Sequence, residues 1–171
     1  MNIKVAFLFD KQNDWIFSFF KDFNFERNNF SFYKFFETDK LTDFDIVFLL
    51  GYTKILSNEF LKKNKLTLVI HESDLPNGKG FSPLQWQIIQ GKSEIIFSLI
   101  KASEKVDSGD IFLQSRVIFD GTELYEEIRK KQAEATKSLI IEFLNDYPYN
   151  KSKKQEGSGY FFLRRTKADG E

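Results

Sequence analysis

The residue with the clearest capacity for chemistry is His71, the single histidine of the chain. An unperturbed imidazole titrates close to neutral pH, so it can accept and release protons during a reaction. A lone histidine is more often structural than catalytic, but the position of His71 favours a functional role. It follows the apolar run Leu66–Ile70, which is typical of a buried strand, and it precedes a loop. Because open α/β sheets bind ligands beyond the carboxyl ends of their strands, we expect His71 at a functional edge.

A histidine used in this way needs a nearby carboxylate that orients the ring or shares its proton. Asp107 is the best candidate, because it lies in a glycine-containing loop between two predicted strands, Glu94–Lys101 and Ile111–Phe119. The segment Asp-Ser-Gly-Asp also fits an ordinary turn. Other carboxylates compete for the same role, namely Asp110, Asp74 and Glu72.

Composition excludes several kinds of site and partner. The chain has no cysteine and one histidine, which excludes a thiolate nucleophile, a disulfide framework and a multi-histidine metal site. Basic and acidic residues number 25 each, so we expect no nucleic-acid partner. The apolar runs are too short to cross a bilayer, and the N-terminus does not resemble a signal peptide. We therefore expect a cytoplasmic protein without a metal or a membrane partner.

The elements that position these side chains follow from the hydrophobic pattern. Strands are predicted at four apolar or aromatic-rich runs: Ile3–Asp10, Phe30–Phe36, Phe44–Gly51 and Leu66–Ile70. Apolar spacings of three and four predict an amphipathic helix over residues 15–23, with Asn13 or Asp14 as its N-cap. Further helices are expected at Ser57–Lys63, at Leu84–Gln90, and between an N-cap at Thr122 and a stop at Pro148.

This order of strands and helices is typical of the α/β class, with a Rossmann-like wound, mostly parallel sheet flanked by helices. The 171 residues suit one compact catalytic domain, which we place at residues 1–147. Residues 148–171 form a basic, polar C-terminal extension, and Tyr160–Arg164 within it is expected to be hairpin-like.

Several spaced residues around His71 together resemble a known family. They are His71-Glu-Ser-Asp-Leu-Pro76, Lys79-Gly80, Pro83, Trp86 and Gly91. These residues resemble the signature of the formyltransferases that use N10-formyltetrahydrofolate, which runs roughly His-x-Ser-x-Leu-Pro, Arg-Gly, Pro and then an Asp-x-Gly loop. The family aspartate falls on Asp107, at the separation from His71 expected in the family. The resemblance covers about residues 3–146 in unbroken order, so we expect the formyltransferase fold.

The resemblance implies an enzyme that takes a formyl group from N10-formyltetrahydrofolate as co-substrate. His71 would then be the general base or proton shuttle, and Asp107 would orient its ring. The segment Gly51–Ser57 resembles the turn that receives the folate pterin ring, which implies a pterin pocket bordered by Lys54, Ile55 and Leu56, with Gly80 also on the folate side. The Leu75–Pro76 bond is expected to be cis, as in relatives.

The sequence departs from the family pattern at two positions. Val69 stands where the family usually has an asparagine that holds the formyl oxygen, and losing one such donor typically costs about 10²–10³ in rate. Ser73 and Asn77 are nearby polar residues that are candidates to contact substrate in its place. Lys79 stands where arginine is common, and the two cations differ in bidentate contacts.

The resemblance leaves the acceptor amine to be inferred from other features. Methionyl-tRNA formyltransferases carry an additional C-terminal domain, and glycinamide ribonucleotide formyltransferases have a glycine-containing phosphate loop that residues 10–15 lack. The amino-sugar branch fits better, with a nucleotide-linked amino sugar near Asp10 and Trp15 and a diphosphate near Arg164. Trp15 fits a core position equally well, and Arg164 also fits a solvated tail.

Two other functions fit the same residues. One is a catalytically weak or inactive module that binds folate or a nucleotide sugar, which Val69 favours. The other is a hydrolase that releases formate from formyl-folate. A homodimer is a further expectation, because surplus phenylalanine and the C-terminal segment offer an interface.

Overall fold

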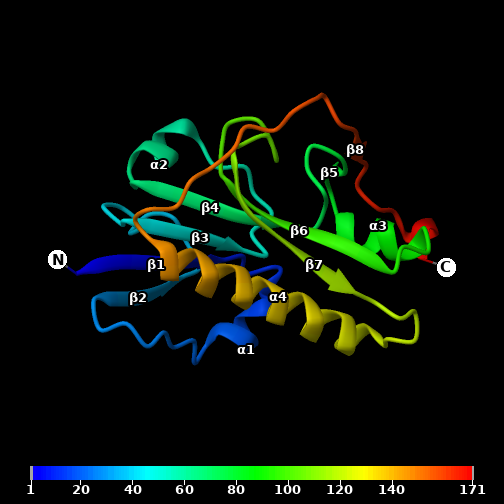
Figure 1. Cartoon of the computed structure of the whole chain (residues 1–171), viewed down its shortest axis with the longest axis horizontal. Coiled ribbons are helices and arrows are strands. Elements are labelled where there is room, and N and C mark those ends of the chain that lie inside the picture. Colours follow the sequence, from blue (N-terminus) through cyan, green and yellow to red (C-terminus); the bar gives the residue numbers. More distant parts are fainter. Residues whose placement is uncertain (1, 171) are drawn as a thin grey trace. The chain divides into compact units, whose positions relative to one another are not determined.

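The computed structural model describes residues 2–170, which divide into two compact units. One unit contains the residues up to 70 together with 101–104, and the other contains 71–100 together with the residues from 105 onward. Figure 1 labels the helices and strands of both.

The first unit is built on parallel strands that lie side by side in the order β2–β1–β3–β4 (Figure 1). Their bounds are β1 Ile3–Phe9, β2 Phe30–Phe35, β3 Ile46–Leu50 and β4 Leu66–His71. The apolar runs thus form buried parallel strands as predicted. Phenylalanine fills much of this core. The centre of the buried Phe7 ring lies 5.5 Å from the ring centre of Phe20 and 5.9 Å from that of Phe48. Such ring pairs add to the stabilisation from burial alone.

The helix predicted over residues 15–23 is shorter than expected. The structure has a 3-10 turn, η1 (Asp14–Ile16), followed by a single α-helical turn, α1 (Phe17–Phe20). Asn13 occupies the N-cap position of η1, as predicted, but its side chain makes no capping hydrogen bond, because its amide donates to the carbonyl oxygen of Gly51 at 2.8 Å. An aromatic-rich sequence has little helix propensity of its own, so the segment follows its tertiary contacts.

The short helix after β3 begins as predicted. α2 spans Asn58–Lys62, and the hydroxyl oxygen of its N-cap Ser57 accepts the backbone N–H of Phe60 at 3.2 Å. Glu59 in the first turn faces the positive end of the helix dipole.

The second unit contains the remaining elements and the long helix. They are β5 Lys79–Gly80, α3 Pro83–Ile89, β6 Glu94–Lys101, β7 Ile111–Ile118, α4 Tyr125–Asp146, β8 Phe161–Phe162 and η2 Lys167–Gly170. β6 and β7 pair in the antiparallel direction. α4 packs on β7, where the rings of Phe112 and Phe143 meet edge-on at 5.3 Å.

The N-cap predicted for the long helix at Thr122 is wrong. The hydroxyl and the backbone N–H of Thr122 both donate to the Asp120 carboxylate, so the turn closes before the helix begins. The helix is capped at Leu124, whose backbone N–H donates to the Glu127 carboxylate at 2.7 Å. A carboxylate reaching back from the first turn satisfies one of the free N–H groups at this end.

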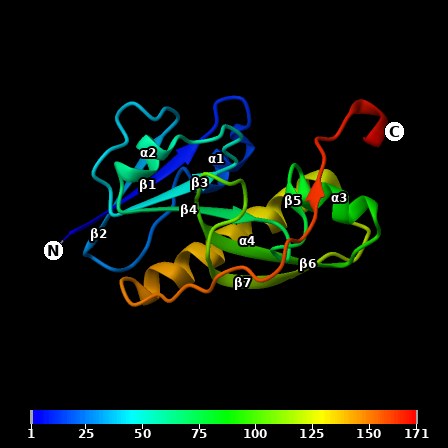
Figure 2. The same cartoon turned by 90° about the horizontal axis from the view of Figure 1, so that it is seen from above.

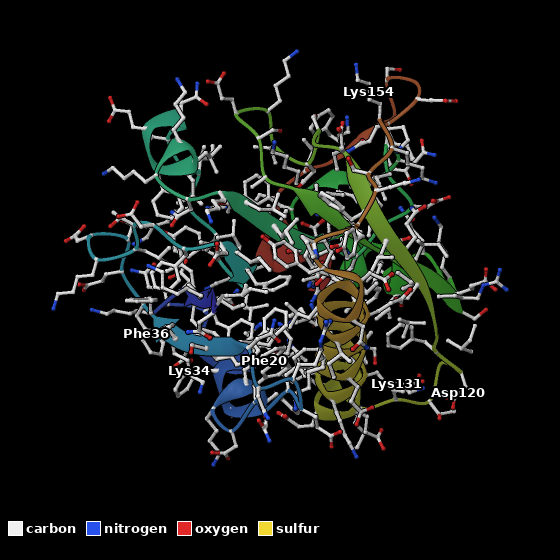
Figure 3. All side chains as sticks on the ribbon, turned by 60° about the vertical axis from the view of Figure 1, so that its left-hand side comes forward. Phe20, Lys34, Phe36, Asp120, Lys131 and Lys154 are labelled. Carbon is white, nitrogen blue, oxygen red and sulfur yellow. The ribbon has the colours of Figure 1, made fainter. Side chains whose placement is uncertain are left out.

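Glu123, just before this helix, accepts several hydrogen bonds with its carboxylate. Its carboxylate accepts the Lys131 ammonium group and the backbone N–H groups of Asp120 and Gly121. Figure 3 shows Asp120 and Lys131 at this end of the helix. The hydrogen bond from Lys131, then those from the backbone, lower the pKa of Glu123 to about 2. A carboxyl with a lowered folded-state pKa stabilises the fold above its ordinary pKa, and this contribution is lost as the pH falls toward the lowered value.

We therefore expect Glu123→Gln to lower the Tm at neutral pH and to have a smaller effect as the pH falls from 4.5 toward 2. Thermal unfolding of both proteins across this range measures the difference. The matched control is Glu134→Gln, which removes an exposed pair with Lys130 at 4.0 Å and should hardly change the Tm. A Tm difference for Glu123→Gln that stays constant with pH would contradict this assignment.

The segment after α4 does not form the hairpin expected at Tyr160–Arg164. The chain reverses after α4 and runs back toward β5, as Figure 2 shows. There β8 pairs with β5 in the parallel direction, with Lys79 opposite Phe161 and Gly80 opposite Phe162. The C-terminal segment therefore pairs, through β8, with a strand that lies far away in the sequence.

Candidate active site

β4 places His71 at its last position, where the strand leads into the loop that precedes β5. The residue is buried, and its ring nitrogen Nε2 lies 2.7 Å from the carbonyl oxygen of Gly78. A carbonyl oxygen only accepts, so Nε2 carries the hydrogen of this bond. Nδ1 is then the ring nitrogen that faces the second polar partner.

That partner is Asp107. Its Oδ1 lies 3.4 Å from His71 Nδ1, and its Oδ2 accepts the backbone N–H of Gly80 at 2.8 Å. The backbone of Asp107 has a φ of +52°, a left-handed conformation that few non-glycine residues adopt and that is often found at functional sites. Each oxygen of the carboxylate therefore has a partner: Oδ1 faces the His71 ring, and Oδ2 accepts the N–H of Gly80 in the segment before α3.

This arrangement is suited to proton transfer. A proton that reaches Nδ1 is shared with the Asp107 carboxylate, while the bond to Gly78 keeps the ring in place. The exposed fractions are small, 7% for the His71 side chain and 11% for that of Asp107. Both side chains are therefore largely shielded from solvent.

The other carboxylates that competed for this role have different partners. Asp74 accepts the side-chain amide of Gln114 at 3.1 Å, and Glu72 accepts that of Gln132. Asp110 lies in the same loop as Asp107, next to β7. The partner that contacts the ring is thus Asp107.

Two polar side chains beside the pair were not expected from sequence reasoning as part of the site. The ammonium group of Lys79 donates to the hydroxyl of Ser108 at 3.3 Å and lies 5.8 Å from the ring centre of Phe161. Lys79 is buried although it carries a charge. In the sequence, Lys79 stands out only as a departure from the family pattern. Ser108 stands out only as part of the Asp-Ser-Gly turn that contains Asp107.

Further hydrogen bonds hold the loop after His71. The hydroxyl of Ser98 on β6 donates to the carbonyl oxygen of Ser73 at 2.7 Å. The amide of Gln114 on β7 donates to the Ser98 hydroxyl at 3.0 Å. The Leu75–Pro76 peptide bond within the loop is cis, as the family resemblance implies.

The predicted pterin residues lie in the first unit, in the loop between β3 and α2. Ile55 is 77% exposed, and Leu56 is partly buried against a core cluster that includes Leu8 and Phe60. Gly80, also predicted on the folate side, lies in the second unit and uses its N–H to hold Asp107. The exposed apolar side chain of Ile55 is suited to contact an aromatic ligand.

Asp10 and Trp15, predicted to contact the acceptor, lie in the first unit. Asp10 is buried, and its carboxylate accepts the backbone N–H of Gln12 at 3.0 Å and that of Thr53 at 3.2 Å. The Thr53 hydroxyl, then the Gln12 N–H, lower the pKa of Asp10 below its ordinary value. Trp15 is partly buried, with its ring edge-on to Phe19 at 6.3 Å. Asp10 thus links the loop after β1 to the loop between β3 and α2 through hydrogen bonds.

The other predicted contact residues, Ser73, Asn77 and Arg164, lie in the second unit. Ser73 is buried, and its hydroxyl has no hydrogen-bond partner among residues 2–170. Asn77 is exposed. Arg164 is exposed as well, with its guanidinium 4.8 Å from the ring centre of Phe81. Val69 is partly buried in β4, on the same face as His71, since side chains two apart share a face.

Solved structures identify the fold. A methionyl-tRNA formyltransferase from Clostridium thermocellum matches 96% of this chain and 73% of its own, with a TM-score of 0.78 and 24% identity. A 4-N formyltransferase from Francisella tularensis matches 94% of this chain and 76% of its own, with a TM-score of 0.66 and 18% identity. The N-formyltransferase from Helicobacter canadensis in complex with folinic acid and dTDP-3-aminofucose matches 95% and 71%, with a TM-score of 0.65 and 18% identity.

The chain is therefore an α/β protein with the formyltransferase fold, a mostly parallel mixed sheet flanked by helices. It belongs to the formyl transferase family, whose model matches residues 5–144. Both conclusions confirm the resemblance found in the sequence.

Curated relatives include methionyl-tRNA formyltransferases. That of Coprothermobacter proteolyticus is 33% identical over 101 residues, which are 58% of this chain and 33% of the relative. That of Thermosipho melanesiensis is 33% identical over 126 residues, 73% of this chain and 41% of the relative. This chain thus spans less than half the length of the curated relatives it matches here.

Residues 2–170 contain neither of two further features. No helix there has the length and apolarity to cross a membrane. No group of three or more histidine, cysteine, aspartate or glutamate side chains is placed to hold a metal ion.

Proposed function

We propose that the protein transfers a formyl group from N10-formyltetrahydrofolate to the amine of an amino sugar, most simply one linked to a nucleotide. The observation that carries this proposal is the contact of His71 Nδ1 with Asp107 Oδ1 at 3.4 Å, at the end of a parallel strand. Family membership supports formyl transfer as the reaction class.

In this reaction the neutral amine attacks the formyl carbon. The bond between that carbon and the folate nitrogen breaks, the attacking nitrogen loses a proton, and the folate nitrogen gains one. No oxidant or reductant is needed, so the work of the protein is to orient the two substrates and to move this proton.

His71 and Asp107 carry out the proton transfer in our proposal. Nδ1 receives the proton of the attacking amine, and Asp107 Oδ1 stabilises it there. The bond from Gly80 to Oδ2 keeps the carboxylate in position throughout. Lys54, Ile55 and Leu56 border the folate pterin through their backbone and apolar surface.

The sugar acceptor rests on the sequence features near Asp10, Trp15 and Arg164, and on the solved neighbour that holds dTDP-3-aminofucose. A specific observation favours a second acceptor, methionyl-tRNA. The curated relatives reported above are named methionyl-tRNA formyltransferases. The balanced charge of the chain, 25 basic against 25 acidic residues, speaks against a polyanion as long as tRNA.

The test is a product assay with the purified protein. N10-formyltetrahydrofolate is incubated with a panel of dTDP- and UDP-linked amino sugars, with methionyl-tRNA, or with no acceptor, and products are separated by mass spectrometry. We expect an N-formyl sugar and an equal amount of tetrahydrofolate. Formylation of tRNA alone would overturn the sugar acceptor. Formate release without an acceptor would identify a hydrolase, and binding without turnover would identify a binding module.

Val69 provides a prediction about the formyl oxygen. We expect Val69→Asn to raise turnover about tenfold or more, because one added donor to a developing oxyanion is worth about 10²–10³ where its placement is ideal. The matched control is Val69→Leu, which has nearly the shape of asparagine without a donor and should bring no gain. Steady-state turnover of the three proteins measures this. Unchanged or lower turnover in Val69→Asn would show that another group already binds the oxygen.

A further inference from the structure

The tail after α4 touches both loops that carry the candidate active site. We propose that the backbone of residues 153–163, here called the strap, holds the His71–Asp107 pair in its working geometry, and that the side chain of Gln155 is a positioning residue for Asp107. This inference rests on the proposed function of the pair. It assigns a role in the reaction to residues outside the family match at 5–144.

Gln155 holds the loop that carries Asp107. Its side-chain Nε2 donates to the backbone carbonyl oxygens of both Asp107 and Gly109, each at 2.8 Å. Two carbonyl acceptors require a group with two hydrogens to donate, which the amide NH₂ of Gln155 supplies. Beside it, the backbone N–H and carbonyl of Lys153 bond those of Ile111 at 2.9 and 2.8 Å. Both ends of the 107–111 segment are thereby attached to the strap.

The strap then reaches the loop that contacts the His71 ring. The N–H of Lys79 donates to Tyr160 O at 3.0 Å, and that of Phe81 donates to Phe162 O at 3.2 Å. These bonds flank Gly80, whose own N–H holds Asp107 Oδ2. The strap therefore braces the two backbone segments between which the ring and carboxylate meet.

The strap packs closely against its neighbours at three positions. Phe162 is buried, and its ring stacks with Trp86 at 6.3 Å. The indole N–H of Trp86 donates to Leu163 O at 2.8 Å. A Cβ on Gly159 would lie 1.9 Å from the carbonyl oxygen of Pro76, so the strap passes this loop at a distance that only glycine permits.

The energetic reason for such a brace lies at Asp107 itself. Its left-handed φ is unfavourable for a non-glycine residue, so neighbouring contacts must maintain it. If the loop relaxed, the carboxylate would leave the ring, and misplacement by about 1 Å can cost about 10²-fold in rate.

The first test replaces Gln155 with glutamate. Gln155→Glu keeps the shape of the side chain but presents an acceptor to two carbonyl acceptors. We expect kcat to fall about tenfold or more while KM for N10-formyltetrahydrofolate changes less than about twofold, because the substrate is bound but the pair is misplaced. Lys154→Gln is the control: it makes the same change of charge at the exposed neighbouring position (Figure 3) and should alter neither constant.

The second test uses two glycines of the strap that both have a positive φ. Gly159→Ala forces a Cβ against Pro76, whereas Gly157→Ala meets no described atom within 4 Å. Both variants bear the strain of alanine at a positive φ, so their difference isolates displacement of the strap. We expect a fall in kcat in Gly159→Ala of about tenfold relative to Gly157→Ala.

A measurement without substrate separates this proposal from the proposed function. Amide hydrogen exchange of residues 105–110 should accelerate in Gln155→Glu and stay unchanged in Lys154→Gln. Unchanged exchange, or a kcat equal to that of the wild type, would overturn the role of the strap even if His71→Ala is inactive. An active His71→Ala would instead overturn the proposed function.

Discussion

His71→Ala is expected to lower the turnover of formyl transfer by about 100-fold or more, the scale of a positioned acid–base group. The variant removes the ring nitrogen that faces Asp107 and with it the acceptor for the amine proton. The fold should survive, because β4 keeps its pairing with β3 through Leu66–Val69. Steady-state turnover with saturating donor and acceptor measures the effect.

The control for this experiment is His71→Gln. A glutamine amide can still donate to the Gly78 carbonyl in place of Nε2 but cannot carry a proton from the amine. We expect it to be as slow as His71→Ala, with a Tm closer to that of the wild type. Turnover in either variant near the wild-type value would rule out His71 as the proton acceptor.

Asp107→Asn should lower turnover by about the same two orders of magnitude. The asparagine oxygen can keep the bond from the Gly80 N–H, but the side chain then faces Nδ1 with an amide that neither carries a negative charge nor shares a proton. The loop is therefore retained and the chemistry is lost. Initial rates of tetrahydrofolate formation, measured well below the Tm, record the change.

Asp110→Asn is the comparison for this variant, since it removes a carboxylate from the same loop. We expect its turnover to stay within about twofold of the wild type, because this partly buried carboxylate is not the one that contacts the His71 ring. Equal losses in the two variants would mean that the loop needs negative charge in general, and Asp107 would lose its special role.

Much of the sheet was predictable because buried parallel strands leave a strong local signal. The runs that became β1, β3 and β4 are almost continuously apolar. Ser57 was also identified as a helix N-cap from local sequence alone. Elements whose signal is local were therefore predicted with nearly correct bounds.

The errors arise where a distant partner decides or, at Thr122, where a neighbouring turn competes with the helix. The side chain of Asn13, although at an N-cap position, donates to Gly51 rather than accepting from the first turn. Thr122 donates to Asp120, two residues earlier, before the long helix begins. β8 has two residues, which is too short for any periodicity, and its partner β5 lies some 80 residues earlier in the chain. Propensity cannot express contacts of this kind.

The candidate site divides in the same way. His71 and Asp107 were identified from residue type, strand position and family spacing, and the structure brings them into contact. Gly78 and Gln155 act through a backbone carbonyl and a tail amide, for which the sequence carries no chemical signature. The structure was needed to find them.

The most direct test of the central claim, that ring and carboxylate act as one proton-transferring unit, is the turnover of His71→Ala combined with Asp107→Asn. Residues that act as a unit are strongly non-additive, so we predict that the double variant is about as slow as His71→Ala alone. A double variant in which the two separate losses multiply would show that the groups act independently, and the account would be wrong.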